Sequence, residues 1–410
     1  MSEKLTVKNV VNINKSTLSA KDNWSTLKYL DTGNITENQI DTLQIFQKGE
    51  KLPSRAKRKV EKGTIIYSTV RPNQKHFGYF DTHSNDLVVS TGFATLDVID
   101  PRINSKYLYY LLTQNSVISQ LQSIGENSTS SYPSIRPEDI GNLSFVFPDI
   151  DIQNKIADIL TFIDKKIQIN NQINQELEAM AKTLYDYWFV QFDFPDQNAK
   201  PYKSSGGKMV YNPELKREIP EGWGVDSLWN IANFYNGLAM QKYRPDTNED
   251  DYLPVIKIRE MMNGFSKDTE RARLDIPSEA VVDRGDILFS WSATLEVIIW
   301  GKEKGALNQH IFKVTSDTYP KSFIYFELKS YLKVFKAIAE LRKTTMGHIT
   351  QDHLKQAKIV VPPIELISKL DAKLQPIMLK QQILENQNQE LTQLRDWLLP
   401  MLMNGQVKVE

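Results

Sequence analysis

The segment IQNKIADILTFIDKKIQINNQINQELEAMAKTLYDYWFVQFDF, residues 152–194, repeats apolar side chains on alternating steps of three and four. This spacing is typical of a long helix with a heptad seam. The seam consists of Ile156, Ile159, Ile163, Ile173, Leu177, Met180, Leu184 and Tyr187. Taken by itself, the segment could be an ordinary oligomerisation coil.

A second copy of the pattern lies 214 residues further along the chain. The matched pairs are Ile156 with Leu370, Leu160 with Leu374, Ile163 with Ile377, Leu177 with Leu391, Met180 with Leu394 and Leu184 with Leu398. A gapless offset over so many positions indicates an internal duplication in which each half ends in a long helix. The second helix can bury its seam by running back along the first, so we predict an antiparallel intramolecular pair with pseudo-two-fold symmetry. Asn170 on the seam either fixes the register of this pair or lies at a wet edge.

The segments before the two helices repeat the same order of elements. A strand predicted at 64–70 matches one at 286–290, and the apolar run 87–98 matches 308–314. A helical pattern at 106–123 matches 323–341, and the strand 143–147 matches the run before Pro362. Residues 1–23 are polar and predict a loosely held arm, and the Pro/Gly-rich stretch 195–220 predicts a connector without elements. We therefore expect an α+β protein with two similar mixed α/β domains separated by two long antiparallel helices.

Composition excludes several classes of protein. The chain has no cysteine, which rules out disulfides and thiolate metal sites and fits a reducing cytoplasm. The N-terminus has no apolar signal region and no run reaches the length of a membrane helix, so we expect a cytoplasmic protein. Net charge is zero, and residues 1–150 carry 17 basic and 15 acidic side chains. A DNA-binding surface would therefore have to come from the arrangement of charges.

Several quoted segments resemble the specificity (S) subunits of type I restriction-modification systems. They are the central run 156–184, YWFVQFDFP (187–195), IPEGW (219–223) and LRDWLLPMLMNG (394–405). The resemblance covers essentially the whole chain, and its central helix run is the specific part. It implies target recognition domain 1 at 1–150, a spacer helix at 151–194, a linker at 195–220, target recognition domain 2 at 221–363 and a C-terminal spacer helix at 364–405.

The same resemblance implies how the protein works. Each domain would read one half of a bipartite site in double-stranded DNA, two methyltransferase (M) subunits would dock on the helices, and motor-nuclease (R) subunits would join them. S-adenosylmethionine, Mg²⁺ and ATP are then expected on the partner subunits, with no cofactor on this chain. One departure is Pro376 in the second helix, where the first copy has Phe162, because an interior proline kinks or breaks a helix.

Motifs for catalysis are absent or weak. The sequence contains no Gly-x-Gly-x-x-Gly loop, and Gly206-Gly-Lys208 lacks the other residues of a phosphate loop. No Asn-Pro-Pro-aromatic or Asp-Pro-Pro-aromatic tetrapeptide of an amino-methyltransferase occurs. Pro195-Asp196 with Glu214-Leu-Lys216 matches a loose nuclease pattern but lies in the linker, and His348 and His353 are not at a metal-ligand spacing. We predict a non-catalytic subunit. The alternative is a duplicated scaffold that uses its helices for assembly and does not bind DNA.

Candidate DNA contacts are side chains that can bind base edges or phosphates and that fall on predicted loops or strand ends. For each, the simpler interpretation is a solvated surface group. In the first domain they are Arg55, Lys57, Arg71, Lys75, His76, Ser128, Thr129, Ser130 and Tyr132. In the second they are Lys242, Arg244, Lys257, Arg259, Gln309, His310, Lys343, Thr344, Thr345 and His348. We also expect Tyr185, Trp188 and Phe189 to be exposed at the helix end, where they could cap the second domain or, with a slight preference, receive a partner.

Overall fold

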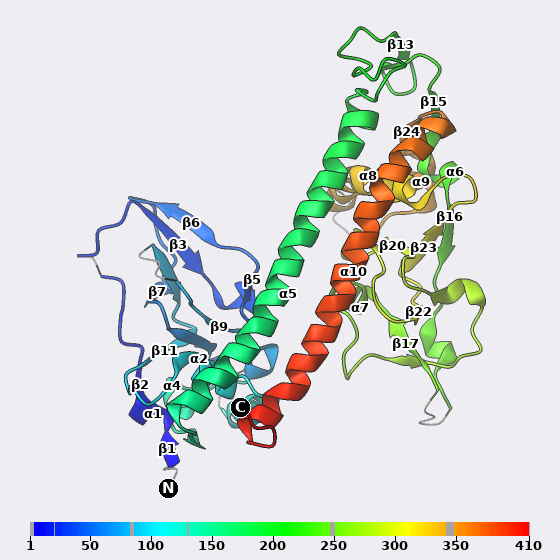
Figure 1. The fold of residues 1–410 in the computed structure, drawn as a ribbon. Coiled ribbons are helices and arrows are strands. Elements are labelled where there is room, and N and C mark those ends of the chain that lie inside the picture. Colours follow the sequence, from blue (N-terminus) through cyan, green and yellow to red (C-terminus); the bar gives the residue numbers. More distant parts are fainter. Residues whose placement is uncertain are drawn as a thin grey trace. The chain divides into compact units, whose positions relative to one another are not determined.

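The computed structural model describes residues 4–19, 21–82, 86–128, 131–246, 251–341 and 348–409. Its contacts divide the chain into two compact units, residues 1–166 with 391–410 and residues 167–390. We describe each unit by itself. Two long helices, α5 (Ile150–Tyr185) and α10 (Ile364–Met403), contribute a segment to each unit (Figure 1).

The first unit is built on two four-stranded sheets with the orders β6-β3-β10-β7 and β2-β11-β8-β9. Its strands are β1 (Lys4–Thr6), β2 (Val11–Ile13), β3 (Thr26–Leu30), β4 (Ile35–Thr36), β5 (Gln39–Ile40), β6 (Gln44–Gln47), β7 (Ala56–Lys59), β8 (Ile65–Ser68), β9 (Phe77–Tyr79), β10 (Leu87–Ser90), β11 (Phe93–Val98) and β12 (Ser144–Val146). Its helices before α5 are α1 (Val7–Val10), η1 (Thr32–Asn34), η2 (Pro72–Gln74), α2 (Ser105–Leu112), α3 (Asn115–Glu126) and α4 (Pro137–Gly141). β10 pairs in parallel with β3, and its other neighbour, β7, is antiparallel.

The second unit repeats this plan with the sheet orders β18-β17-β22-β19 and β16-β23-β20-β21. Its strands are β13 (Met209–Asn212), β14 (Arg217–Pro220), β15 (Gly224–Ser227), β16 (Asn233–Asn236), β17 (Leu253–Ile256), β18 (Arg271–Ala272), β19 (Val281–Val282), β20 (Ile287–Ser290), β21 (Glu296–Ile299), β22 (Gly305–Leu307), β23 (Ile311–Thr315) and β24 (Lys358–Val361). Its helices besides α5 and α10 are η3 (Asp186–Val190, a π-helical turn), α6 (Leu228–Ile231), η4 (Met240–Tyr243), α7 (Ile258–Asn263), η5 (Ser278–Ala280), α8 (Lys321–Leu341) and α9 (Gln351–Gln356).

The two units share one topology. In both, one sheet contains a parallel pair (β10 with β3, β22 with β17), and a two-stranded sheet joins an early strand to the strand before the long helix (β1-β12, β15-β24). β8 and β20 are central strands, and both faces of each are covered, because the successive residues Ile65 and Ile66, and likewise Ile287 and Leu288, are at most 2% exposed. The predicted α+β fold with two similar mixed domains is confirmed.

The prediction of a loosely held N-terminal arm was wrong for residues 7–11. Val7 and Val10 are fully buried and Val11 is 3% exposed, because α1 and β2 pack into the core of the first unit. Short apolar clusters within a polar stretch can anchor a terminus, and composition alone misses them.

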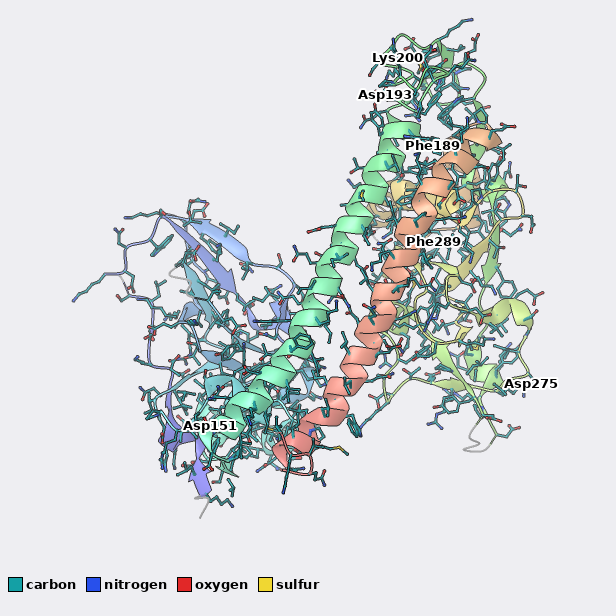
Figure 2. All side chains as sticks on the ribbon, viewed as in Figure 1. Asp151, Phe189, Asp193, Lys200, Asp275 and Phe289 are labelled. Atoms are coloured by element: carbon teal, nitrogen blue, oxygen red, sulfur yellow. The ribbon has the colours of Figure 1, made fainter. Side chains whose placement is uncertain are left out.

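The connector between the halves is also more structured than predicted, since residues 209–220 form the hairpin β13–β14. The helix before it ends at Tyr185 and passes into the turn η3. Figure 2 labels Phe189 near this helix end, together with Asp193 and Lys200 in the segment that follows. Tyr185, Trp188 and Phe189 are at most 4% exposed and belong to the core of the second unit, so the expectation of exposed aromatics was wrong.

Two other elements differ from the predicted pattern. The helix expected over 106–123 is two helices, α2 and α3, and Asn104 caps α2 by accepting hydrogen bonds from the backbone N–H groups of Lys106 and Tyr107. The apolar run 87–98 is two strands joined by a turn at Thr91 and Gly92.

Inside the second unit, α5 and α10 form an antiparallel pair. Asn170 is fully buried and its amide donates to Asn388 Oδ1 at 2.9 Å, and Asn388 donates to Asn171 Oδ1 at 2.7 Å. Asn174 donates to the backbone oxygen of Gln381, so partner numbers fall as residue numbers rise. Asn170 is therefore a buried polar residue of the seam rather than a wet edge.

Pro376 does not end the second helix, because α10 continues to Met403. The missing N–H of Pro376 removes the helical hydrogen-bond donor for Ala372 O. Within the described ranges, no helix is both long and apolar enough to cross a membrane.

Candidate nucleic-acid interface

In the first unit, backbone hydrogen bonds bring together three loops, two of which carry candidate DNA contacts. The N–H of Thr69 donates to Gly92 O at 2.9 Å, and the N–H of Ile135 donates to Thr69 O at 2.8 Å. The turn at Thr91 in addition donates to the backbone oxygen of Arg55 at 2.9 Å. The loop after β8, the turn between β10 and β11, and the loop before α4 therefore meet at one place.

Arg71 lies at this meeting point in a strained conformation. Its φ of 47° is in the left-handed region, and its backbone N–H donates to Pro133 O at 2.9 Å. The guanidinium lies 5.7 Å from the centroid of the Tyr132 ring. Non-glycine residues held in this region are enriched at functional sites, which favours Arg71 as a presented cation.

The second unit contains the same framework. The N–H of Trp291 donates to His310 O at 3.3 Å, and the N–H of Ile349 donates to Trp291 O at 2.8 Å. Ser292 bridges to His348 as Val70 bridges to Ser134, and Ala293 has a φ of 56° where the first unit has Arg71. The turn at Gln309 is bound to the backbone of Leu238 at 2.9 Å. Gln309, His310 and His348 are thus brought together around Trp291.

Several of the predicted contacts form ion pairs within the chain. Lys75 pairs with Glu37 at 2.5 Å, and Arg259 pairs with Glu260 at 2.6 Å. Lys257 and Arg244 share Glu270, at 2.5 and 3.8 Å. The hydrogen bond from Lys257 is the main reason that the pKa of Glu270 is lowered. His76 is directed inward, with Nδ1 2.5 Å from Ile35 O.

Other candidates remain exposed. Arg55, Lys57 and Lys242 are exposed, and the charge of Arg55 contributes to lowering the pKa of Asp31. Tyr132 is also exposed and lies next to Arg71, whereas Ser128, in the same loop after α3, is half-buried. Thr129, Ser130, Lys343, Thr344 and Thr345 lie outside the described residues.

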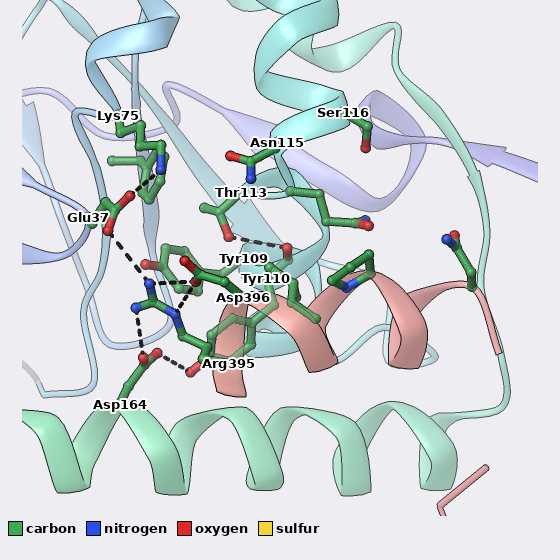
Figure 3. A pocket seen from close by; sticks show the side chains of 15 residues that line it. Glu37, Lys75, Tyr109, Tyr110, Thr113, Asn115, Ser116, Asp164, Arg395 and Asp396 are labelled. Atoms are coloured by element: carbon green, nitrogen blue, oxygen red, sulfur yellow. Dashed lines mark hydrogen bonds and ion pairs between the residues drawn. The ribbon is translucent and has the colours of Figure 1, made fainter. Parts of the chain in front are cut away.

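A charged cavity of about 280 Å³ lies beside Lys75 in the first unit (Figure 3). Arg395 of α10 is its centre and pairs with Asp396 at 2.8 Å, Asp164 at 3.2 Å and Glu37 at 3.7 Å. Burial alone would lower the pKa of Arg395, but these carboxylates outweigh burial and raise it. Carboxylates line the cavity and neutralise its cations, so it is poorly suited to phosphate and serves to hold the Glu37 and Lys75 loops against α10.

The residues of the loose nuclease pattern are engaged elsewhere. Asp196 accepts hydrogen bonds from the backbone N–H groups of Asn198 and Lys200, which closes a turn. Glu214 lies 3.7 Å from Lys358. In the ranges that the structure describes, no group of three or more His, Cys, Asp or Glu side chains is placed to hold a metal ion.

Sequence reasoning missed Trp291 and its partner Asn236, whose Oδ1 accepts the indole N–H at 3.0 Å. In the sequence, an aromatic residue that directly follows a strand is most simply interpreted as part of the hydrophobic core, so Trp291 was not considered as a binding residue. The offset between Thr69 and Trp291 is 222 residues rather than 214, because loop lengths differ, and only the shared backbone framework identifies the match.

Comparison with known proteins agrees with this repeated plan. A family model described as "Type I restriction modification DNA specificity domain" matches twice, over residues 2–179 and 220–393. The HindI specificity subunit of Haemophilus influenzae, a type I restriction enzyme subunit, is 27% identical, and the match covers 92% of this chain and 94% of that protein. The MjaIX specificity subunit of Methanocaldococcus jannaschii is also 27% identical, over 93% of this chain and 84% of its own.

A solved structure shares the fold. The type I restriction-modification S subunit from M. genitalium has a TM-score of 0.54 at 15% identity, and the match covers 98% of this chain and 95% of that one. Each of the two family matches takes in one mixed α/β domain with most of the long helix that follows it. The chain belongs to the type I restriction-modification DNA specificity family.

Proposed function

We propose that this chain is the DNA sequence-recognition subunit of a type I restriction-modification complex and reads a bipartite site through its two domains. The observation that carries the proposal is the double family match, joined to one backbone framework that occurs in both units. Each framework gathers side chains able to contact bases and phosphates. The scaffold alternative has no comparable support, because it gives no role to these two gathered loop sets.

The residues proposed to contact DNA belong to two groups. Arg55, Lys57 and Lys242 are exposed cations suited to phosphates. Arg71, Gln309, His310 and His348 lie on the frameworks themselves and are suited to base edges. Lys75, Arg244, Lys257 and Arg259 would have to exchange their present carboxylate partners for phosphates, so we expect smaller effects from their removal.

Catalysis is proposed to reside in partner subunits, two that methylate adenine and others that move along and cleave DNA. S-adenosylmethionine, Mg²⁺ and ATP would bind those partners. The long helices offer them apolar surface, since large apolar side chains are exposed along both. These side chains are Phe162 (72%), Leu394 (43%) and Trp397 (56%) in the first unit, and Ile169 (51%), Met180 (52%) and Leu379 (58%) in the second.

The test uses the chain assembled with its methyltransferase partner. We expect the complex to methylate adenine in one bipartite motif, read by methylome sequencing of a host that expresses both, and the chain alone to transfer no methyl groups. DNA affinity should fall as salt rises, and Arg55→Ala or Lys57→Ala should each reduce the slope of log K against log salt by about 1. Lys165→Ala, an exposed lysine on α5, is the matched control and should leave the slope unchanged.

Two results would contradict the proposal. A complex that assembles but methylates no defined motif would remove the role in sequence recognition. Methyl transfer by the purified chain without a partner would remove the non-catalytic assignment.

A further inference from the structure

Trp291 occupies the centre of the framework in the second unit. Its backbone N–H and carbonyl make both of the hydrogen bonds that join the three segments, to His310 and to Ile349. The corresponding residue in the first unit is Thr69, which makes the same two bonds. The position is therefore fixed by the main chain, whereas its side chain differs between the halves.

The indole is held in place and remains partly exposed. Its ring lies 6.0 Å from the Phe312 ring, 5.6 Å from the His310 ring and 6.5 Å from the His348 ring, measured between centroids. Its N–H already donates to Asn236 Oδ1 at 3.0 Å. With that donor used, the ring can offer DNA only an apolar surface, at a site where its neighbours offer polar groups.

The major groove displays one apolar group that distinguishes base pairs, the 5-methyl group of thymine. A rigid aromatic ring that needs no further hydrogen bond can pack against this methyl group, whereas a polar side chain would gain no hydrogen bond from it. The rings of His310, Phe312 and His348 lie within 6.5 Å of the indole, between centroids, so the indole packs as one member of a ring cluster rather than standing alone as a platform for an unpaired base.

We propose that Trp291 is a specificity-determining residue that reads a T·A pair in the half-site of the second domain by contact with the thymine 5-methyl group. This inference rests on the proposed function in DNA recognition. The first domain reads with different chemistry, because Thr69 replaces the indole and Arg71 replaces Ala293. The two half-sites therefore differ in base composition at equivalent positions.

The experiment is a double-mutant cycle between protein and DNA. Methylome sequencing of the wild-type complex first defines the bipartite motif. Each thymine of the motif is then replaced singly by deoxyuridine, which removes only the methyl group. Affinities are measured for the wild-type complex and for the complexes that carry Trp291→Ala or Trp291→Phe.

We expect one thymine of the second half-site to lose affinity about fourfold on replacement in the wild-type complex, the loss expected for one buried methyl group. The same replacement should have almost no effect with Trp291→Ala, and should keep most of its effect with Trp291→Phe, which retains an apolar ring. Trp229→Ala, which removes a partly exposed indole on α6 of the same unit, should behave as wild type.

The possible results distinguish a failure of the proposed function from a failure of the role proposed for Trp291. If the wild-type complex methylates no bipartite motif, the proposed function fails. If it methylates one, but no thymine of the second half-site depends on its methyl group, the reading by Trp291 is wrong. It is equally wrong if the methyl dependence persists unchanged in Trp291→Ala.

Discussion

Glu327 is an acid held among apolar side chains where α8 meets the end of α5. The hydroxyl of Tyr185, a residue 1% exposed, donates to Glu327 Oε1 at 2.5 Å. Burial raises the pKa of Glu327 to about 7, although the hydrogen bond from Tyr185 and the charge of Arg217 oppose the shift. The folded protein therefore keeps a proton that the unfolded chain, with a pKa of 4.5, releases. Stability conferred by this group is present below about pH 4.5 and is lost as pH rises to about 7.

Glu327→Gln should remove this loss, because the amide oxygen still accepts from Tyr185 and carries no charge. We expect the free energy of unfolding at about pH 8 to rise by about 1–2 kcal/mol, less than the full shift implies because Glu327 keeps some exposed surface. Urea denaturation at about pH 5 and pH 8 measures it. Glu340→Gln, an exposed residue of the same helix, is the control. An equal response of the two variants would show that Glu327 does not titrate in this range.

The sequence allowed us to select candidate DNA-contacting residues, but not to predict which other side chains they contact in the folded protein. Lys75 and Glu37 are 38 residues apart, and Lys257 and Glu270 are 13 residues apart with α7 between them. Sequence reasoning treats each lysine as a solvated group, because ion pairs between distant residues depend on the fold. For the same reason Arg71 was identified as a cation, while its position over Tyr132 became visible only in the structure.

At the scale of elements, the polar layer of Asn170, Asn171 and Asn388 interrupts an apolar helix seam. Asn170 is fully buried and donates to Asn388 Oδ1, so its removal leaves that oxygen without this donor. A buried group that loses its partner costs about 1–3 kcal/mol. Asn388 is only half-buried, and Asn170 Oδ1 is buried with no hydrogen bond in the described part of the chain, so the cost here lies at the lower end of this range. The layer also favours one register of the pair, since a slip would bury these amides against apolar side chains.

Asn170→Ala should therefore lower the free energy of unfolding by about 1–2 kcal/mol. Gln172→Ala, an exposed position two residues along α5, should change it by less than about 0.5 kcal/mol. Denaturant unfolding of the two variants beside the wild type measures the difference. Equal stability of the two variants would mean that the amide layer contributes nothing to the pair.

The long helices were predictable because their periodicity extends over many turns, whereas short elements and boundaries were not. The seam continues past Tyr185 in the sequence, yet the chain turns at η3 because Trp188 and Phe189 are buried in the domain core. Pro376 remains inside α10, where packing along the rest of the helix outweighs one lost hydrogen bond. The hairpin β13–β14 was missed because the Pro and Gly residues around it led us to predict a loop over the whole segment.

At the scale of the whole molecule, the duplication predicts modular recognition. Replacing residues 1–150 with the matching segment of another specificity subunit should change one half of the methylated motif and leave the other half intact. Each unit has its own sheets and core, so neither requires the other to form its framework. Methylome sequencing of the chimera with its partners measures the result, and a change in both halves would refute independent reading.

The backbone framework has a consequence for how new targets arise. Its two shared bonds run between main-chain N–H and carbonyl groups, and the side chains differ at equivalent positions of the two units: Thr69 and Trp291, Gly92 and His310, Ser134 and His348. Any residue except proline can form main-chain bonds of this kind, whatever its side chain. Substitutions at these positions other than Gly92, where a Cβ would lie 2.8 Å from Thr32 Cγ2, can therefore alter the preferred bases while the loops keep their places. A restriction system built on such a chain can drift to a new DNA target through few mutations, without passing through unfolded intermediates.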